Sequence, residues 1–214
     1  MRPVFPTYSY SNRTLLLFLS ILSIAPFASG QTDCQLKKQK DDLKVYTCSL
    51  AESKVKVLKA EFIIEDTSFK DLLEFLKDIS NCVNWQYNTR EAKALQNRDG
   101  AIIYRTVIEA PWPVSNREMI LELSSAFDSV KQELTIISRS IDYEYPQSDD
   151  LVRVPFALGK WQVVSMQGSL KVIYTLRIDP GGSVPIWLIN LTMSEGPYNS
   201  FSNLKEEFRK RRRG

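Results

Sequence analysis

Four polar side chains in the central part of the sequence are the candidates for acid–base chemistry, namely Tyr104, Arg105, Glu109 and Arg153. Their spacing does not single out a catalytic set. The chain contains no histidine, which excludes hydrolases that use a histidine base and most zinc and haem sites. Its three cysteines lack CxxC spacing, so they predict neither a thiolate metal site nor thioredoxin-like chemistry. We therefore expect no metal, no cofactor and no enzymatic activity.

A β-sheet must position these side chains, because most of the chain has the composition of strands. Val, Ile, Leu and Tyr are concentrated in short segments that are separated by turn residues such as Asp128-Ser129 and Gln167-Gly168-Ser169. From residue 91 to residue 179 no helical pattern separates these segments, which favours an antiparallel meander over βαβ units. The expected strands are residues 42–49, 54–65, 101–110, 118–127, 134–141, 151–166 and 170–179.

A short helix is expected between the second and third of these strands. Residues 66–68 (DTS) offer side-chain oxygens that can cap a helix. Apolar residues then recur at every third or fourth position from Phe69 to Ile79, which is the pattern of one helix face.

A long helix is expected after the last strand. Ser183 suits its N-cap and Pro185 its first turn. An apolar stripe continues from Ile186 to Phe208, with a bend at residues 196–197 (GP), where proline removes a backbone donor. Because this stripe must be buried, the concave face of the sheet is its available partner. The sequence therefore predicts an α+β fold in which a curved sheet wraps around one long helix.

Three segments resemble the START family of lipid-transfer domains. They are residues 110–118 (APWPVSNRE), residues 151–154 (LVRV), and residues 179–185 (DPGGSVP) with 187–190 (WLIN). Their order and spacing match the family, and with the flanking elements they cover nearly all of residues 35–208. The resemblance implies a helix-grip fold, in which a curved antiparallel sheet encloses a hydrophobic tunnel for one lipid. The C-terminal helix is then the lid of that tunnel.

The resemblance also implies which residues contact the lipid. The apolar stripe of the last helix would otherwise be ordinary core, but its first half is expected to contact the ligand. Met193 suits an exchangeable partner, because its side chain is flexible and polarizable. By contrast, Arg117 and Glu118 match positions that hold the loop between two strands. The expected lipid-binding residues are Tyr104, Arg105, Trp112, Arg153, Phe156, Trp161, Ile186, Ile189, Asn190 and Met193.

Arg105 and Arg153 can each face either side of a strand, since successive side chains alternate. An arginine inside the tunnel needs a partner such as Glu109 or a ligand head group. We favour an inward Arg153, which lies in a matched segment, and leave both orientations open for Arg105. Trp112 lies between two prolines. It either contacts a membrane and controls access to the tunnel, or it packs beneath the last helix.

The residues around Trp85 bear on the type of lipid. We expect Trp85 to pack between helix and sheet. Phosphatidylcholine-binding relatives carry Arg and Asp around the matching tryptophan, whereas residues 81–86 (NCVNWQ) supply neither charge. This departure favours a sterol-like, hopanoid-like, isoprenoid or fatty ligand over a phospholipid, unless Arg105 or Arg153 replaces the missing charge.

The N-terminal residues predict export. Arg2 and Arg13 precede an uncharged apolar run over residues 14–25, and residues 28–30 (ASG) are small. The run is shorter than the ~20 residues of a membrane-spanning helix, which favours a cleaved signal over an uncleaved anchor. We expect a signal peptide over residues 1–30, a lipid-binding domain over 31–208, and a periplasmic or secreted location. There Cys34 and Cys48 could pair and leave Cys82 free.

A basic segment over residues 209–214 (RKRRRG) is expected to follow this domain as a tail. The formal charge of +3 includes Arg2 and Arg13, so it is +1 without them. Nucleic acid is not an expected partner, since no basic face with interleaved aromatic residues precedes the tail. The tail either contacts an anionic membrane, at about 1 kcal/mol per basic residue, or frays in solvent, which we favour. We expect a monomer.

Three functions are compatible with these patterns. The first is non-enzymatic binding and transfer of a single lipid. The second is a helix-grip enzyme, such as a polyketide cyclase or a lipid-modifying protein, which would need acid–base groups among Tyr104, Arg105, Glu109 and Arg153. The third is a lipid-sensing module, in which a partner protein recognises the lid movement.

Overall fold

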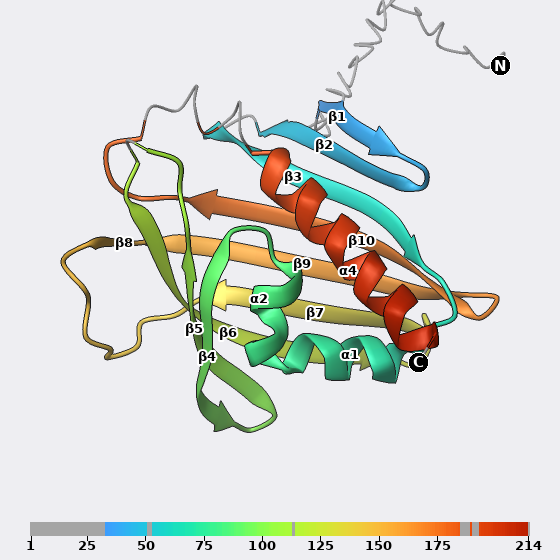
Figure 1. Cartoon of the computed structure of the whole chain (residues 1–214). Coiled ribbons are helices and arrows are strands. Elements are labelled where there is room, and N and C mark those ends of the chain that lie inside the picture. Colours follow the sequence, from blue (N-terminus) through green and yellow to red (C-terminus); the bar gives the residue numbers. More distant parts are fainter. Residues whose placement is uncertain (1–32, 51–52, 113, 185–188, 190–192, 214) are drawn as a thin grey trace, which may run out of the picture. The chain divides into compact units, whose positions relative to one another are not determined.

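The computed structural model describes residues 33–50, 53–112, 114–184, 189 and 193–213 (Figure 1). These residues belong to one compact unit, Thr32–Gly214. The predicted signal peptide and the site candidates Ile186 and Asn190 lie outside the described residues. Among the residues that are described, no helix is long and apolar enough to cross a membrane.

One curved sheet dominates the described part of the chain (Figure 1). Its ten strands have the order β1-β2-β3-β10-β9-β7-β6-β5-β4, with β8 beside β6. Neighbouring strands are antiparallel except for β6 and β8, which are parallel. The strands are β1 (Cys34–Lys40), β2 (Leu43–Leu50), β3 (Ser53–Ile64), β4 (Thr89–Arg98), β5 (Ala101–Ile108), β6 (Asn116–Asp128), β7 (Glu133–Ser140), β8 (Leu151–Arg153), β9 (Phe156–Met166) and β10 (Ser169–Asp179).

Helices cover one face of this sheet. Figure 1 shows α1 (Phe69–Lys77), α2 (Cys82–Trp85) and α4 (Glu195–Arg213) in front of it, with the 3-10 turn η1 (Ile79–Asn81) between the first two. The predicted cap of α1 is present: the Ser68 hydroxyl accepts the Asp71 N–H, and the Asp71 carboxylate accepts the Ser68 N–H. The predicted α+β class and helix-grip arrangement are therefore confirmed.

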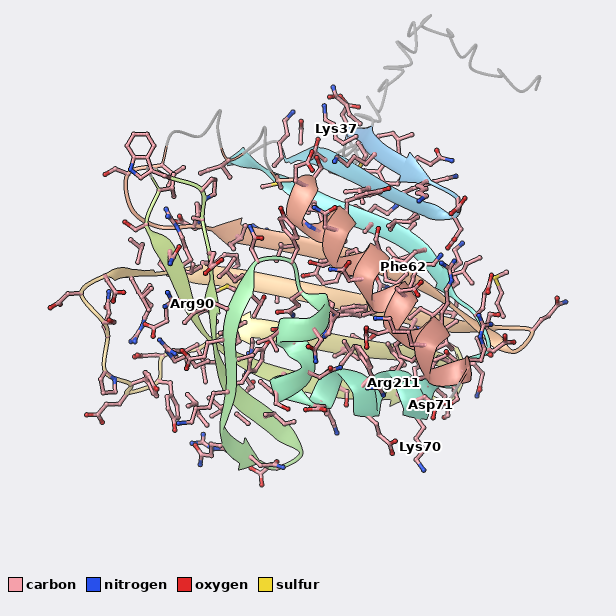
Figure 2. All side chains as sticks on the ribbon, viewed as in Figure 1. Lys37, Phe62, Lys70, Asp71, Arg90 and Arg211 are labelled. Atoms are coloured by element: carbon pink, nitrogen blue, oxygen red, sulfur yellow. A yellow bond between two sulfur atoms is a disulfide. The ribbon has the colours of Figure 1, made fainter. Side chains whose placement is uncertain are left out.

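Aromatic side chains join α4 to the sheet. Phe62 of β3 lies beneath α4 (Figure 2) and stacks on Phe201, with ring centroids 4.7 Å apart. Trp161 of β9 meets the same Phe201 ring edge-on at 5.5 Å. Phe208 contacts Phe75 of α1 at 4.8 Å. Burying side chains of this size contributes about 1.5–3 kcal/mol each, so they fix the helix on the sheet.

The last helix differs from its prediction in two places. Residues 185–188 and 190–192 of its predicted first part lie outside the described residues, and Ile189 between them is helical. The described helix α4 begins at Glu195, so residues 196–197 occupy its first turn instead of a central bend. There the missing N–H of Pro197 leaves no intrahelical bond unmade. At the other end α4 continues through Arg213, so residues 209–213 are helical and not a frayed tail. Arg211 lies over the Phe75 ring, 4.5 Å from its centroid, and Lys210 pairs with Glu207 at 2.8 Å.

The strands also differ from their predictions in two places. The expected strand over residues 151–166 is interrupted at Pro155, which cannot donate to a ladder. Its first part, β8, pairs with β6, while β9 pairs with β7. Both edge strands, β1 and β4, escaped prediction, because most of their side chains are exposed and show no apolar alternation.

The cysteines have the pairing that the sequence suggested. A disulfide joins Cys34 of β1 to Cys48 of β2, at directly opposed positions of the two strands. Cys82 is free and buried in α2. The disulfide thus attaches the edge strand β1 to the rest of the sheet.

Candidate functional site

A cavity of about 240 Å³ lies between the sheet and the helices. Its floor is one face of the sheet. Ser138 of β7 and Thr89 of β4 contribute one residue each, and in four further strands the lining residues occupy every second position, as a shared face requires. These residues are Tyr104, Thr106 and Ile108 of β5, Met119, Leu121 and Leu123 of β6, Ala157, Gly159 and Trp161 of β9, and Tyr174, Leu176 and Ile178 of β10.

The opposite wall comes from the helices. Leu76, Ile79, Cys82 and Trp85 line it from α1 to α2, and Gly196, Pro197, Ser200 and Phe201 line it from the start of α4. A hydrogen bond closes the wall between these two parts, since the Tyr87 N–H donates to the Ser200 hydroxyl at 2.9 Å. The first turns of α4 are therefore part of the cavity and not only its support.

The described lining contains no Asp, Glu, Lys or Arg. Residues 185–192 (PIWLINLT), which precede α4, contain none in the sequence either. Burying a charge without a partner is costly, so this cavity favours an uncharged or apolar guest. No group of three or more His, Cys, Asp or Glu side chains that could hold a metal is present in the described part of the chain.

Hydroxyl groups supply most of the polarity. The Tyr104 hydroxyl and the Ser138 hydroxyl are hydrogen-bonded at 2.7 Å, in a pair in which either can donate. Burial raises the pKa of Tyr104 well above its ordinary value, and the bond from Ser138 only partly offsets this. Burial likewise raises the pKa of Tyr174, and it raises that of the Cys82 thiol to about 12. All three groups are uncharged at neutral pH.

Two further polar atoms in lining residues lack a partner. The Thr106 hydroxyl oxygen and the Trp85 indole Nε1 are buried and make no hydrogen bond in the described structure. Thr106 is only 1% exposed and Trp85 only 4%. Buried polar groups are normally paired, so these two atoms are unusual in a cavity wall.

Arg105 and Arg153 lie outside this lining, which corrects the inward orientation that we favoured for Arg153. Both guanidinium groups bind Glu118, which is fully buried. Arg153 Nη2 lies 2.8 Å from the Glu118 carboxylate, and Arg105 Nη1 lies 2.7 Å from Glu91. The reason is the strand alternation: Tyr104 and Thr106 face the cavity, so Arg105 between them faces away.

The same ion-pair cluster confirms that Glu118 has a structural role. Glu118, and not Glu109, is therefore the shared partner of the two arginines. Glu109 is exposed. Arg117 donates to the Ser115 carbonyl and so holds the loop before β6.

The remaining candidates lie in the cavity lining, elsewhere in the core, or at the surface. Tyr104 and Trp161 line the cavity. Ile189 is partly buried against the core and Met193 is buried, but neither is among the described lining residues. Phe156 is 43% exposed and Trp112 is 93% exposed. Trp112 therefore does not pack beneath the helix.

The sequence did not identify several of the residues that line the cavity. Thr106 and Ile108 share the face of Tyr104 and could have been found from the period of two along β5. Ser138 is a polar residue among isoleucines in β7, and Tyr174 lies in β10, yet neither has a local signal for contact with a cavity. Pairing across strands places them there, and that pairing is not visible in any one segment.

Comparisons with known proteins agree with this geometry. The START domain family model matches residues 34–212. The uncharacterized protein PA1579 of Pseudomonas aeruginosa is 27% identical over 202 residues, which cover 93% of this chain and 98% of that protein. The structure also resembles a STAR-related lipid transfer protein fragment from Xanthomonas axonopodis, with a TM-score of 0.75, 26% identity, and coverage of 82% of this chain and 98% of that one. Human STARD10 shares the fold, with a TM-score of 0.71, 20% identity, and coverage of 83% and 73%.

Proposed function

The chain belongs to the START domain family, and on this basis we propose that it binds one lipid in the cavity and carries it without changing it chemically. The observation that carries the proposal is the cavity lining, which is uncharged and mostly apolar over its described residues. Removal of apolar surface from water stabilises a complex by about 25 cal/mol per Å². A few hundred Å² of lipid surface can therefore offset the entropic cost of capture.

The position of the charged groups supports a carrier over an enzyme. Acid–base chemistry in the cavity would depend on Tyr104, Arg105, Glu109 and Arg153. Two of these are bound to Glu118 away from the lining, and Glu109 is exposed. Tyr104 does line the cavity, but burial raises its pKa, which makes it a poor base at neutral pH. The described lining therefore offers no pair of side chains that could act as general acid and general base.

We propose that the lipid enters where α4 begins. The C-terminal half of α4 is held by buried aromatic contacts and by ion pairs from Lys205 to Asp42 and from Arg212 to Asp66. Its first turns line the cavity but are held at the surface by an ion pair between Lys38 and Glu195. Movement of residues 195–200 would open the cavity, while the ring contacts of Phe201 and Phe208 hold the rest of the helix on the sheet. Contact with the membrane would come from Trp112.

Export is part of the proposal. The Cys34–Cys48 disulfide supports it, because stable disulfides are typical of oxidising compartments, as does the predicted signal over residues 1–30. Intact-mass measurement of the protein from its native host, after alkylation under denaturing conditions without reduction, is the test. We expect loss of about thirty N-terminal residues and a single alkylated thiol, that of Cys82. A full-length chain with three alkylated thiols would rule out export.

The test of lipid binding is native mass spectrometry of residues 31–214, purified without detergent, followed by solvent extraction and lipid identification. We expect a bound species of lipid mass. Leu176→Trp, which fills the cavity from β10, should abolish it, whereas Lys171→Trp, at an exposed position of the same strand, should not. A wild-type protein that carries no lipid and takes up none from vesicles would end the proposal.

A further inference from the structure

We propose that the bound lipid is an uncharged alcohol, whose hydroxyl group is hydrogen-bonded inside the cavity by the cluster Tyr104, Ser138 and Thr106. This inference rests on the proposed function, since it names the class of lipid that the same cavity takes. It is carried by three features of the lining: the missing charges, the paired hydroxyls, and the atoms without partners.

The charges exclude an ionised head group from the interior. An ionised carboxylate, phosphate or amine that entered the cavity would need a counter-charge. The described lining has none. The two arginines of β5 and β8 cannot supply one, because both are bound to Glu118 and face away from the cavity. The Tyr104 phenol cannot balance an amine either, since its burial keeps it protonated.

The hydroxyl cluster has unused bonding capacity. Two hydroxyl groups carry two hydrogens, and the bond between Tyr104 and Ser138 uses only one of them. One O–H is left to donate, and the oxygen lone pairs are left to accept. Thr106 faces the same side of β5 as Tyr104, two residues along. The cluster can therefore both donate to a small polar group and accept from it.

The two unpartnered atoms suit a ligand group that can both donate and accept. The Trp85 indole N–H can only donate, whereas the Thr106 hydroxyl can donate and accept. Both are buried without a partner in the described structure, and both belong to lining residues. An alcohol oxygen accepts from a donor and donates its own hydrogen, so a single hydroxyl suits both kinds of site. A hydrocarbon would leave both unpaired.

The test uses four probes that share one hydrocarbon chain and differ in their polar end: hexadecanol, hexadecane, hexadecanoate and hexadecylamine. Each is titrated against lipid-free protein by displacement of the uncharged dye Nile red, with native mass spectrometry as a second readout. We expect hexadecanol to bind about tenfold more tightly than the other three, which is the effect of roughly one hydrogen bond. Equal binding of alcohol and alkane, or tighter binding of the acid or amine, would overturn the proposal.

Variants connect the preference to the cluster. Thr106→Val and Tyr104→Phe should each reduce the preference for hexadecanol over hexadecane to less than about threefold, because each removes one hydroxyl group of the cluster. Thr135→Val, a matched change on β7 outside the described lining, should keep the full preference. If Thr106→Val and Tyr104→Phe kept the full preference for hexadecanol, the cluster would not be the cause of that preference.

A last measurement does not depend on the variants. Lipid extracted from wild-type protein of the native host should gain mass on acetylation, as a free hydroxyl does. An extracted lipid without a free hydroxyl contradicts this inference and leaves the proposed function intact. A protein that binds none of the four probes and yields no lipid contradicts the proposed function itself, so the two failures are distinguishable.

Discussion

Lys38 of β1 reaches Glu195 in the first turn of α4, with 2.6 Å between the ammonium nitrogen and the carboxylate. The same ammonium lies over the ring of Tyr198, 5.0 Å from its centroid. β1 is an edge strand that pairs only with β2 among the described strands. An edge strand, attached by the Cys34–Cys48 disulfide, therefore holds the part of α4 that lines the cavity.

This arrangement predicts faster lipid exchange in Lys38→Met. The change removes the ion pair and the ring contact, which together contribute about 1 kcal/mol at an exposed site. We expect lipid release, measured by stopped-flow transfer to acceptor vesicles, to be about two- to fivefold faster, with a loss of no more than about 1 kcal/mol in the free energy of unfolding. Lys37→Met is the control, since the side chain of Lys37 on the same strand (Figure 2) bonds only to Gln35 among the described residues. Identical rates in both variants would show that the contact does not hold the helix.

Glu118 predicts a large loss of stability. Its carboxylate is fully buried and is shared by Arg105 and Arg153. In Glu118→Gln, Arg153 loses its counter-charge and Arg105 keeps only that of Glu91. Breaking a buried pair in this way costs about 3–5 kcal/mol. Urea unfolding should detect this. Glu122→Gln, on the same strand but paired with Arg139 at the surface, should cost less than about 1 kcal/mol. A small effect of Glu118→Gln would mean that the ion-pair cluster contributes little to the stability of the fold.

The same carboxylate predicts a dependence of stability on pH. Burial opposes ionisation of Glu118, but hydrogen bonds from Arg105 and Arg153 outweigh it, so its pKa is lowered on folding. A lowered pKa stabilises the fold above the ordinary carboxyl value of about 4.3, and this contribution is lost as the pH falls from there through the folded-state pKa. The difference in unfolding free energy between wild type and Glu118→Gln should therefore be constant near neutral pH and shrink below about pH 4.3. A difference that grows on acidification would contradict the assignment.

The fold was predictable wherever a strand or helix buries one face. β5, β6 and β10 have apolar residues that identify them, and the cap and stripe of α1 identify that helix. Edge strands show little such pattern: Thr89 is the one buried residue among the ten of β4. The break at Pro155 was visible in the sequence, but the pairing of β8 with β6 was not, because it joins segments far apart in the chain.

The site was predictable only in part. The period of two places Tyr104 and Thr106 on one face, yet periodicity cannot decide whether that face meets a filled core or a cavity; the family resemblance implied the cavity. The orientation of the two arginines depends on Glu118, which is buried because three strands meet around it. Local patterns contain no information on such a partner.

Trp112 predicts a membrane contact that can be removed without loss of fold. Its side chain is 93% exposed, and tryptophan favours the membrane–water interface. Trp112→Ala should weaken binding to vesicles, measured by co-sedimentation, by about 1–2 kcal/mol, or roughly five- to thirtyfold, and should change the unfolding free energy by less than about 0.5 kcal/mol. Val130→Ala, at the equally exposed turn between β6 and β7, should have no such effect. Stronger weakening by the Val130 change would place the contact at the other turn.

Gly159 of β9 predicts a coupling to Tyr174 of the neighbouring strand. A Cβ atom at position 159 would lie 2.8 Å from the Tyr174 hydroxyl oxygen and 3.3 Å from the nearest ring carbon. Gly159→Ala must therefore displace the tyrosine, at about 1–3 kcal/mol of stability for an overpacked site, and weaken Nile red binding because both residues line the cavity. Tyr174→Phe removes the closest atom, so the double variant should recover much of both losses. Urea unfolding and dye titration of all four proteins give the coupling energy; strictly additive losses would mean that Tyr174 does not absorb the change.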